Sequence, residues 1–101
     1  MKKAEFYIAC FNEEYGRFFK KVSGLTCTIN DISFGFHQNR KGGWWVITDL
    51  KSGCSVGYEE TLTAAFRLAF SEAPTMGGLA EKQCYQDLVK RLADYIASQN
   101  K

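Results

Sequence analysis

The residue types best suited to chemistry gather in one short segment, which holds the only histidine and both tryptophans of the sequence. His37 is followed by Arg40 and Lys41, and two glycines then lead into Trp44 and Trp45. Aromatic rings that lie on a sheet beside cations can stack on the bases of single-stranded nucleic acid. The segment therefore predicts a binding surface, and nucleic acid is one class of partner for it.

Three further basic residues, Arg17, Lys20 and Lys21, fall in an expected strand and would extend this surface. The overall charge balance argues against nucleic acid, because 13 Lys and Arg are offset by 11 Asp and Glu to a net charge of +2, and phosphate binding strengthens with the number of cations. Neighbouring residues on a strand also point to opposite faces, so Trp44 and Trp45 cannot form one stacking platform. Nucleic-acid binding therefore stays as the alternative hypothesis.

Enzymatic chemistry finds little support in the residue pattern. A Cys–His catalytic pair would have to use His37, which we expect to be a solvated loop residue, and no serine lies in a Gly-x-Ser-x-Gly motif. The four cysteines lack the close spacing of zinc ligands, and we expect them to be small buried side chains: Cys10, Cys27, Cys54 and Cys84. We predict no catalytic residue, no metal site and no cofactor.

The first half of the sequence alternates between apolar and polar residues, as strands do. Turn signals divide it at residues 12–16, 23–24, 30–31, 37–43 and 49–53. We expect Gly53 to take a positive φ in the last of these turns, and Gly35 to leave room for a neighbouring ring. The pattern predicts an antiparallel sheet of four to five strands, joined as hairpins, over about residues 4–58.

The hydrophobic period changes from two to 3.6 after Thr61, which we expect to cap a helix over about residues 62–73. Its apolar stripe would contain Leu62, Ala65, Phe66, Ala69 and Phe70. Pro74 should end this helix, and the glycines after it should form a loop.

A second helix is expected over about residues 79–98, and its buried stripe would contain Tyr85, Leu88, Leu92, Tyr95 and Ile96. Strands followed by two helices predict an α+β domain, in which both C-terminal helices pack on one face of the sheet.

All residues from 1 to 101 are expected to form a single domain. The composition, 46% hydrophobic and 24% charged, is that of soluble globular proteins. Glu5, Glu13 and Glu14 interrupt the apolar stretch near the N-terminus, so we expect neither a signal peptide nor a membrane span. These features favour a cytoplasmic protein without membrane contact.

Residues 44–69 resemble a pattern found in small orphan proteins of bacteriophages and of conjugative and other mobile elements. The shared features are a Trp-led strand ending in Thr48-Asp49, a turn at Ser52-Gly53, a second strand, and Thr61 before an alanine-rich helix. The resemblance implies a hairpin followed by a helix and assigns no functional residue. Proteins of this kind often act as accessory or counter-defence factors that bind host proteins, so it also implies a protein partner.

Aromatic residues make up 15% of the chain, which is more than one small core needs. Aromatic side chains and arginine are enriched at the centres of protein interfaces. We therefore expect a small non-enzymatic binding protein that contacts a partner protein or a second copy of itself. The residues expected in the binding surface are His37, Arg40, Lys41, Trp44, Trp45, Arg17, Lys20 and Lys21.

Overall fold

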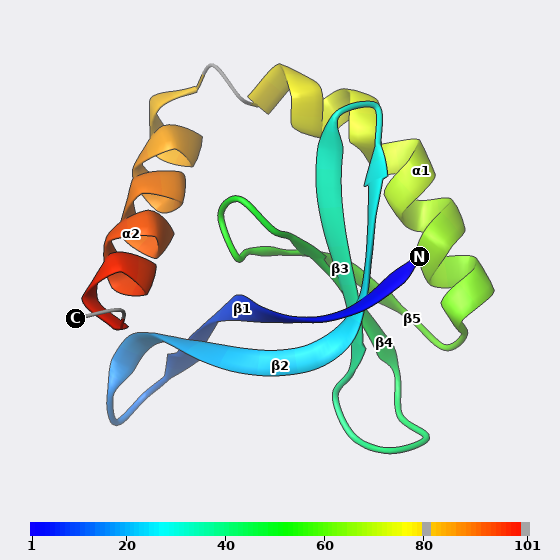
Figure 1. Ribbon diagram of the computed structural model, residues 1–101, viewed down its shortest axis with the longest axis horizontal. Helices are drawn as coiled ribbons and strands as arrows, with labels where there is room; N and C mark the ends of the chain where they lie inside the picture. Colours follow the sequence, from blue (N-terminus) through cyan, green and yellow to red (C-terminus); the bar gives the residue numbers. More distant parts are fainter. Residues whose placement is uncertain (80–81, 100–101) are drawn as a thin grey trace.

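The computed structural model describes residues 1–79 and 82–99, which form a five-stranded antiparallel sheet followed by two helices (Figure 1). The predicted α+β class is confirmed. The elements are β1 (Lys2–Asn12), β2 (Gly16–Ile29), β3 (Ile32–Gln38), β4 (Trp45–Asp49), β5 (Ser55–Glu59), α1 (Leu62–Leu79) and α2 (Gln83–Gln99). None of the described helices is long and apolar enough to cross a membrane.

Each strand pairs with the next one along the chain, so the sheet order is β1-β2-β3-β4-β5. The predicted break at Asn30-Asp31 is a tight turn between β2 and β3, and both of its residues have positive φ, 50° and 67°. Gly53 has a φ of 76° in the β4–β5 turn, as predicted. Turn chemistry that is local in the sequence thus sets the order of the sheet.

The prediction of a chain break at Ser23-Gly24 is wrong, because β2 continues through both residues. Gly24 lies so close to β3 that a Cβ atom there would collide with the carbonyl oxygen of Phe36. A glycine inside a strand marks a bend or a close backbone approach. Gly24 therefore lets the long β1–β2 hairpin stay hydrogen-bonded while it bends.

The bend brings Phe6 of β1 onto the sheet face that points away from α1. Its ring fills the space over Gly35, where a Cβ atom would lie 2.6 Å from Phe6 Cε2. Farther along β1, the backbone N–H of Ala9 donates a hydrogen bond of 2.7 Å to the carbonyl oxygen of Gly53. The outer edge of β1 is thereby tied to the β4–β5 turn, although the two are far apart in the sheet order.

Helix α1 packs against the centre of the sheet through alanines spaced one helical turn apart. The buried residues of this core are Ile29, Phe34, Phe36, Ile47, Ala65, Ala69 and Ala73. The expected apolar stripe of α1 is buried only in part, because Phe70 is 61% exposed and Phe66 is 37% exposed. The sheet supplies the bulky side chains, so the helix can approach closely only through small ones.

The predicted end of α1 at Pro74 is also wrong, because the helix continues to Leu79 with Pro74 inside it. Ala73 is buried and Met76 packs against the core, so burial on both sides of the proline offsets its helix-breaking effect. The proline lacks an N–H for the carbonyl of Phe70, so one hydrogen bond of the helix is missing at this point. The expected loop at residues 77–78 is therefore the last turn of a helix.

Helix α2 lies beside the far end of the β1–β2 hairpin, away from α1 (Figure 1). The Tyr95 ring meets those of Tyr7 and Phe19, with centroid distances of 5.4 and 5.0 Å, and Leu92 is buried. By strand register, Tyr7 and Phe19 belong to the same face as the core residues under α1. The two helices therefore cover one face at opposite ends of a bent sheet.

Candidate binding surfaces

The β3–β4 loop, residues 39–44, holds Arg40 and Lys41 in a closed conformation. The N–H of Gly43 donates to the carbonyl oxygen of Arg40 at 2.8 Å, and the Gln38 side-chain amide donates to the carbonyl oxygen of Gly43 at 3.1 Å. Gly42 takes a φ of 75° within the turn. These bonds order the loop backbone, while Arg40 and Lys41 stay exposed on it.

The two tryptophans diverge, as strand alternation predicts. Trp44 is 41% exposed, and its ring meets that of Tyr58 edge to face with a centroid distance of 5.6 Å. Tyr58 belongs to β5 and is 65% exposed. Trp45 instead packs against the core under α1. We call Trp44, Tyr58, Arg40 and Lys41 the aromatic edge, because β5 is the last strand of the sheet.

His37 is not the solvated loop residue that we expected. It belongs to β3, is only 6% exposed, and meets the Phe6 ring edge to face. Its Nδ1 has no hydrogen-bond partner among the described residues. Burial and the nearby positive charge of Lys20 lower the pKa of His37 from its ordinary value. A histidine covered in this way cannot itself be part of an exposed binding surface.

The three basic residues of β2 divide between the two faces of the strand, because Arg17 and Lys21 share one face and Lys20 points to the other. Lys21 lies over the Tyr7 ring, with its Nζ 5.4 Å from the ring centre. Lys20 lies on the opposite face of the strand, where its charge acts on His37. Arg17 stands near the hairpin tip. The structure thus separates cations that the sequence analysis grouped together.

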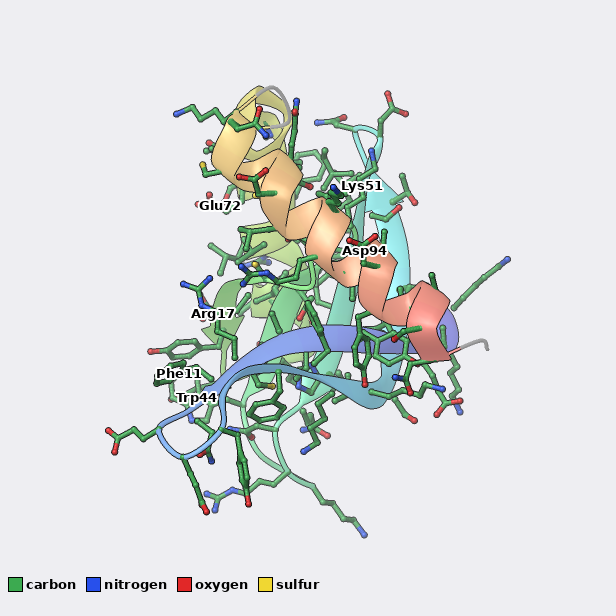
Figure 2. The ribbon with its side chains drawn as sticks, turned by 90° about the vertical axis from the view of Figure 1, so that its left-hand side faces the viewer. Phe11, Arg17, Trp44, Lys51, Glu72 and Asp94 are labelled. Carbon is green, nitrogen blue, oxygen red and sulfur yellow. The ribbon has the colours of Figure 1, made fainter. Side chains whose placement is uncertain are left out.

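Arg17 lines a groove between the tip of the β1–β2 hairpin and α2, which we call the hairpin groove. It has a volume of about 330 Å³ and is lined by Ala9, Cys10, Phe11, Arg17, Phe18, Phe19, Ser52, Cys54, Leu88 and Arg91. Phe11 and Arg17 are cross-strand neighbours, and Figure 2 shows them close together on this side of the molecule. Sequence reasoning missed the groove, because its walls come from three separate parts of the chain.

Behind the groove, the Asp49 carboxylate joins the β4–β5 turn to α2. Asp49 is 2% exposed, and its Oδ2 accepts hydrogen bonds from the Ser52 hydroxyl at 2.7 Å and from the Tyr85 hydroxyl at 2.6 Å. Burial, together with the Asp49 carboxylate, raises the pKa of Tyr85. The turn at Asp49 was predictable from its Asp-x-x-Ser pattern, whereas the bond to Tyr85 was not.

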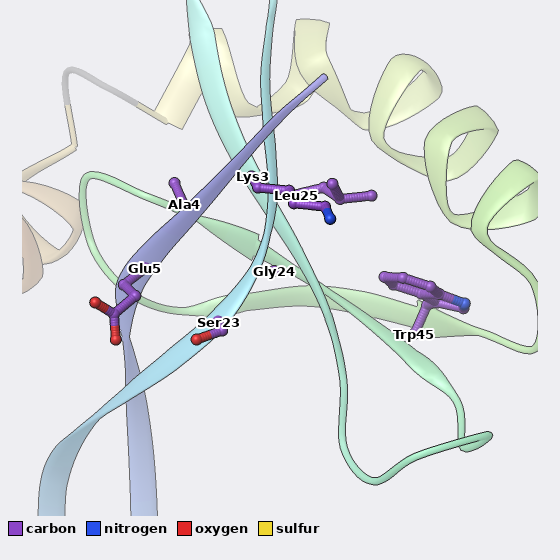
Figure 3. Close-up of a pocket in the computed structure, with 7 residues that line it drawn as sticks. All are labelled: Lys3, Ala4, Glu5, Ser23, Gly24, Leu25 and Trp45. Atoms are coloured by element: carbon purple, nitrogen blue, oxygen red, sulfur yellow. The ribbon is translucent and has the colours of Figure 1, made fainter.

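A second hollow of about 680 Å³ lies beside Trp45 (Figure 3). Trp45 and Leu25 stand at one end of it, and Glu5 and Ser23 at the other. Lys3 and Glu5 give its lining charges of both signs. The hollow therefore shows no preference for either charge in a ligand.

The prediction of four buried cysteines holds only in part. All four are free thiols; Cys10, Cys27 and Cys54 are half-buried, whereas Cys84 is exposed on α2. Burial raises the pKa of the Cys27 thiol, which keeps it protonated. Across the described residues, no three His, Cys, Asp or Glu side chains gather closely enough to hold a metal ion.

The chain was compared with protein-family models, curated proteins and solved structures, and none of them matches it.

Proposed function

We propose that this protein is a non-enzymatic binding protein that acts by contact with a partner protein through the aromatic edge. The observation that carries the proposal is the exposed ring pair of Trp44 and Tyr58. Tryptophan, tyrosine and arginine are the side chains that most often dominate binding energy at protein interfaces. Here all three types occur on one hydrogen-bonded loop and the strand next to it.

The geometry of the aromatic edge supports the docking of a partner protein. The loop backbone is ordered by its own hydrogen bonds, so little conformational entropy is lost when a partner binds. The adjacent strand β5 has no strand beyond it in the described sheet. An edge strand offers backbone donors and acceptors that a partner segment can pair with.

We keep nucleic acid as the alternative partner, and two observations place it second. The planes of the Trp44 and Tyr58 rings are inclined at 70°, so the rings contact each other edge to face. They therefore offer no pair of parallel surfaces on which successive bases could stack. Two cations, Arg40 and Lys41, belong to the aromatic edge, and Lys20 and Lys21 point to opposite faces of β2, so these two lysines do not both add to one surface. Few cations on one surface mean weak phosphate binding.

The resemblance of residues 44–69 supports a further part of the proposal: the protein would be an accessory factor of a phage or mobile element that works in the cytoplasm. The shared segment contains Trp44 and Tyr58. Both residues of the ring pair therefore lie within the segment that carries the resemblance.

The test compares tagged wild-type protein with the W44A/Y58A double variant and with a Y15A/F70A control, which removes two other exposed rings. Proteins retained from a lysate are quantified by mass spectrometry. We expect a partner that the wild type and the control retain and the W44A/Y58A variant loses. Equal retention by all three proteins would contradict the proposal.

Two parallel measurements distinguish the other partners. Anisotropy of labelled single- and double-stranded oligonucleotides, measured from low to high salt, reports nucleic-acid binding; salt-dependent binding lost in W44A/Y58A would favour that alternative. Sedimentation at several protein concentrations reports whether the partner is a second copy of the chain. Circular dichroism confirms that the variants remain folded.

A further inference from the structure

We propose that the hairpin groove is a binding site for a small amphipathic anion, that is, an apolar body that carries a carboxylate. The site is independent of the aromatic edge. It lies between β1, β2, the β4–β5 turn and α2, and its volume of about 330 Å³ falls at the lower end of the range for small-molecule sites.

The charge of the lining selects the sign of the ligand. Arg17 of β2 and Arg91 of α2 both line the groove, and no Asp or Glu is among its described lining residues. Neither arginine forms an ion pair within residues 1–79 and 82–99. Two guanidinium groups without a carboxylate partner, on opposite walls of one groove, are suited to bind a carboxylate by charge-assisted hydrogen bonds.

The Asp49 carboxylate, which lies behind Ser52, does not neutralise this preference. Its Oδ2 is already engaged by the hydroxyl groups of Ser52 and Tyr85 and by the backbone N–H of Ser52. Asp49 is also almost fully buried and absent from the groove lining. A ligand in the groove therefore meets the two arginines and not this carboxylate.

The rest of the lining supplies the apolar half of the site. Phe11 is 71% exposed, and it lines the groove together with the half-buried Phe19 and with Leu88 of α2. Burial of an apolar chain against these side chains gives binding energy in proportion to the area covered. The hollow beside Trp45 lacks this combination, because its charges are of both signs.

The test uses the isotopically labelled full chain, kept reduced, with sodium decanoate as the probe and decan-1-ol as the uncharged control. Amide chemical shifts are followed in the folded protein below the micelle concentration. We expect saturable shifts around the hairpin tip and α2 with decanoate, and much weaker binding of decan-1-ol.

Arg17→Met and Arg91→Met each remove a charge and keep an apolar stem. We expect each to weaken decanoate binding about tenfold, the effect of losing one hydrogen bond to a charged group. Arg67→Met, which changes an exposed arginine of α1, should leave it unchanged, and so should W44A/Y58A. The W44A/Y58A variant distinguishes the two proposals, because partner binding requires the aromatic edge and ligand binding in the groove does not.

Several results of these experiments would overturn the proposal. They are an absence of saturable shifts with decanoate, equal affinity for decan-1-ol, unchanged affinity in both Arg17→Met and Arg91→Met, and shifts confined to exposed rings away from the groove. A Phe-containing acidic peptide is tested in parallel. Binding of that peptide without binding of decanoate would show a protein-docking groove and would also overturn the proposal.

Discussion

Helices α1 and α2 have nearly the same length, 18 and 17 residues, yet they are attached to the sheet in different ways. Helix α1 buries Ala65, Ala69 and Ala73 over a phenylalanine-rich core. Helix α2 buries only Leu92 completely, and it adds the ring contacts of Tyr95 and the hydrogen bond from Tyr85 to Asp49. One attachment is apolar and extensive, and the other depends on a few directional contacts.

This difference indicates which part of the molecule opens first. Regions with few buried apolar contacts open at lower free energy than the core of a domain. Helix α2 should therefore open locally while α1 and the sheet stay folded. The hairpin groove lies against α2, so the less tightly attached part of the fold forms one wall of the proposed ligand site.

The largest expected effect comes from the α1 core. Phe34→Ala should lower the free energy of unfolding by about 3–5 kcal/mol, because it removes a fully buried ring and leaves a cavity. Urea denaturation followed by tryptophan fluorescence measures the loss. Phe70→Ala, at an exposed position of α1, should change stability by less than about 0.5 kcal/mol. Equal losses for the two variants would contradict the core described above.

The second largest effect is expected from a change that weakens the attachment of α2 to the β4–β5 turn. Tyr85→Phe removes the hydrogen bond to the Asp49 carboxylate and should cost about 1.5–3 kcal/mol. Amide hydrogen exchange should become faster in α2 and stay unchanged in α1. Tyr95→Phe is the matched control, because it keeps the ring contacts and its hydroxyl has no hydrogen bond among the described residues. Uniform acceleration in both helices would show that α2 does not open separately.

A smaller effect is expected where β1 meets the β4–β5 turn. Gly53→Ala places a side chain at a φ of 76°, which costs about 1–2 kcal/mol. The new Cβ atom would also lie 3.3 Å from the Ala9 nitrogen and 3.4 Å from Leu92 Cδ2.

Gly42→Ala is the control for that variant, because its φ is 75° and a Cβ atom there meets nothing within 4 Å. Comparison of the two unfolding free energies separates backbone strain from contact with β1 and α2. Gly53→Ala should be the more destabilising of the two. The reverse order would argue against close packing of the turn.

The smallest effect concerns His37 and is absent at neutral pH. The pKa of His37 is lowered in the folded state, so the unfolded chain takes up a proton first as the pH falls. Stability should therefore decrease below about pH 6.5, the ordinary value of histidine. Urea titrations between pH 7.5 and 5 measure this slope. His37→Leu should make the slope shallower, and an unchanged slope would show that another group causes it.

Local sequence signals predicted the elements of this fold more reliably than its shape. Thr61 caps α1 as expected, since its hydroxyl accepts a hydrogen bond from the N–H of Ala64 at 3.1 Å. Pro74 does not end α1 as its local preference predicts, because the burial of its neighbours outweighs that preference. The bend at Gly24 was mistaken for a break, because a sequence pattern does not show which backbone lies next to a glycine.

In the candidate sites too, local patterns predicted some features and missed those that depend on distant parts of the chain. Alternation alone separated Trp44 from Trp45, because the period of a strand is a local property. Trp44, Arg40 and Lys41 of the aromatic edge were thus predicted from the sequence. The ring partner of Trp44, Tyr58, was identified only by the contact between the two rings in the structure. His37 was misplaced, because the hairpin that covers it comes from the start of the chain.

By itself, the sequence determined the antiparallel strands, their main turns, the two amphipathic helices and the divergence of the tryptophans, all of which follow from periodicity and turn chemistry over a few residues. Only the tertiary structure decided that Arg17 and Arg91 share a groove and that Asp49 meets Tyr85. These contacts depend on how a bent hairpin and a distant helix meet. Such long-range geometry arises from packing of the whole chain, and no local pattern encodes it.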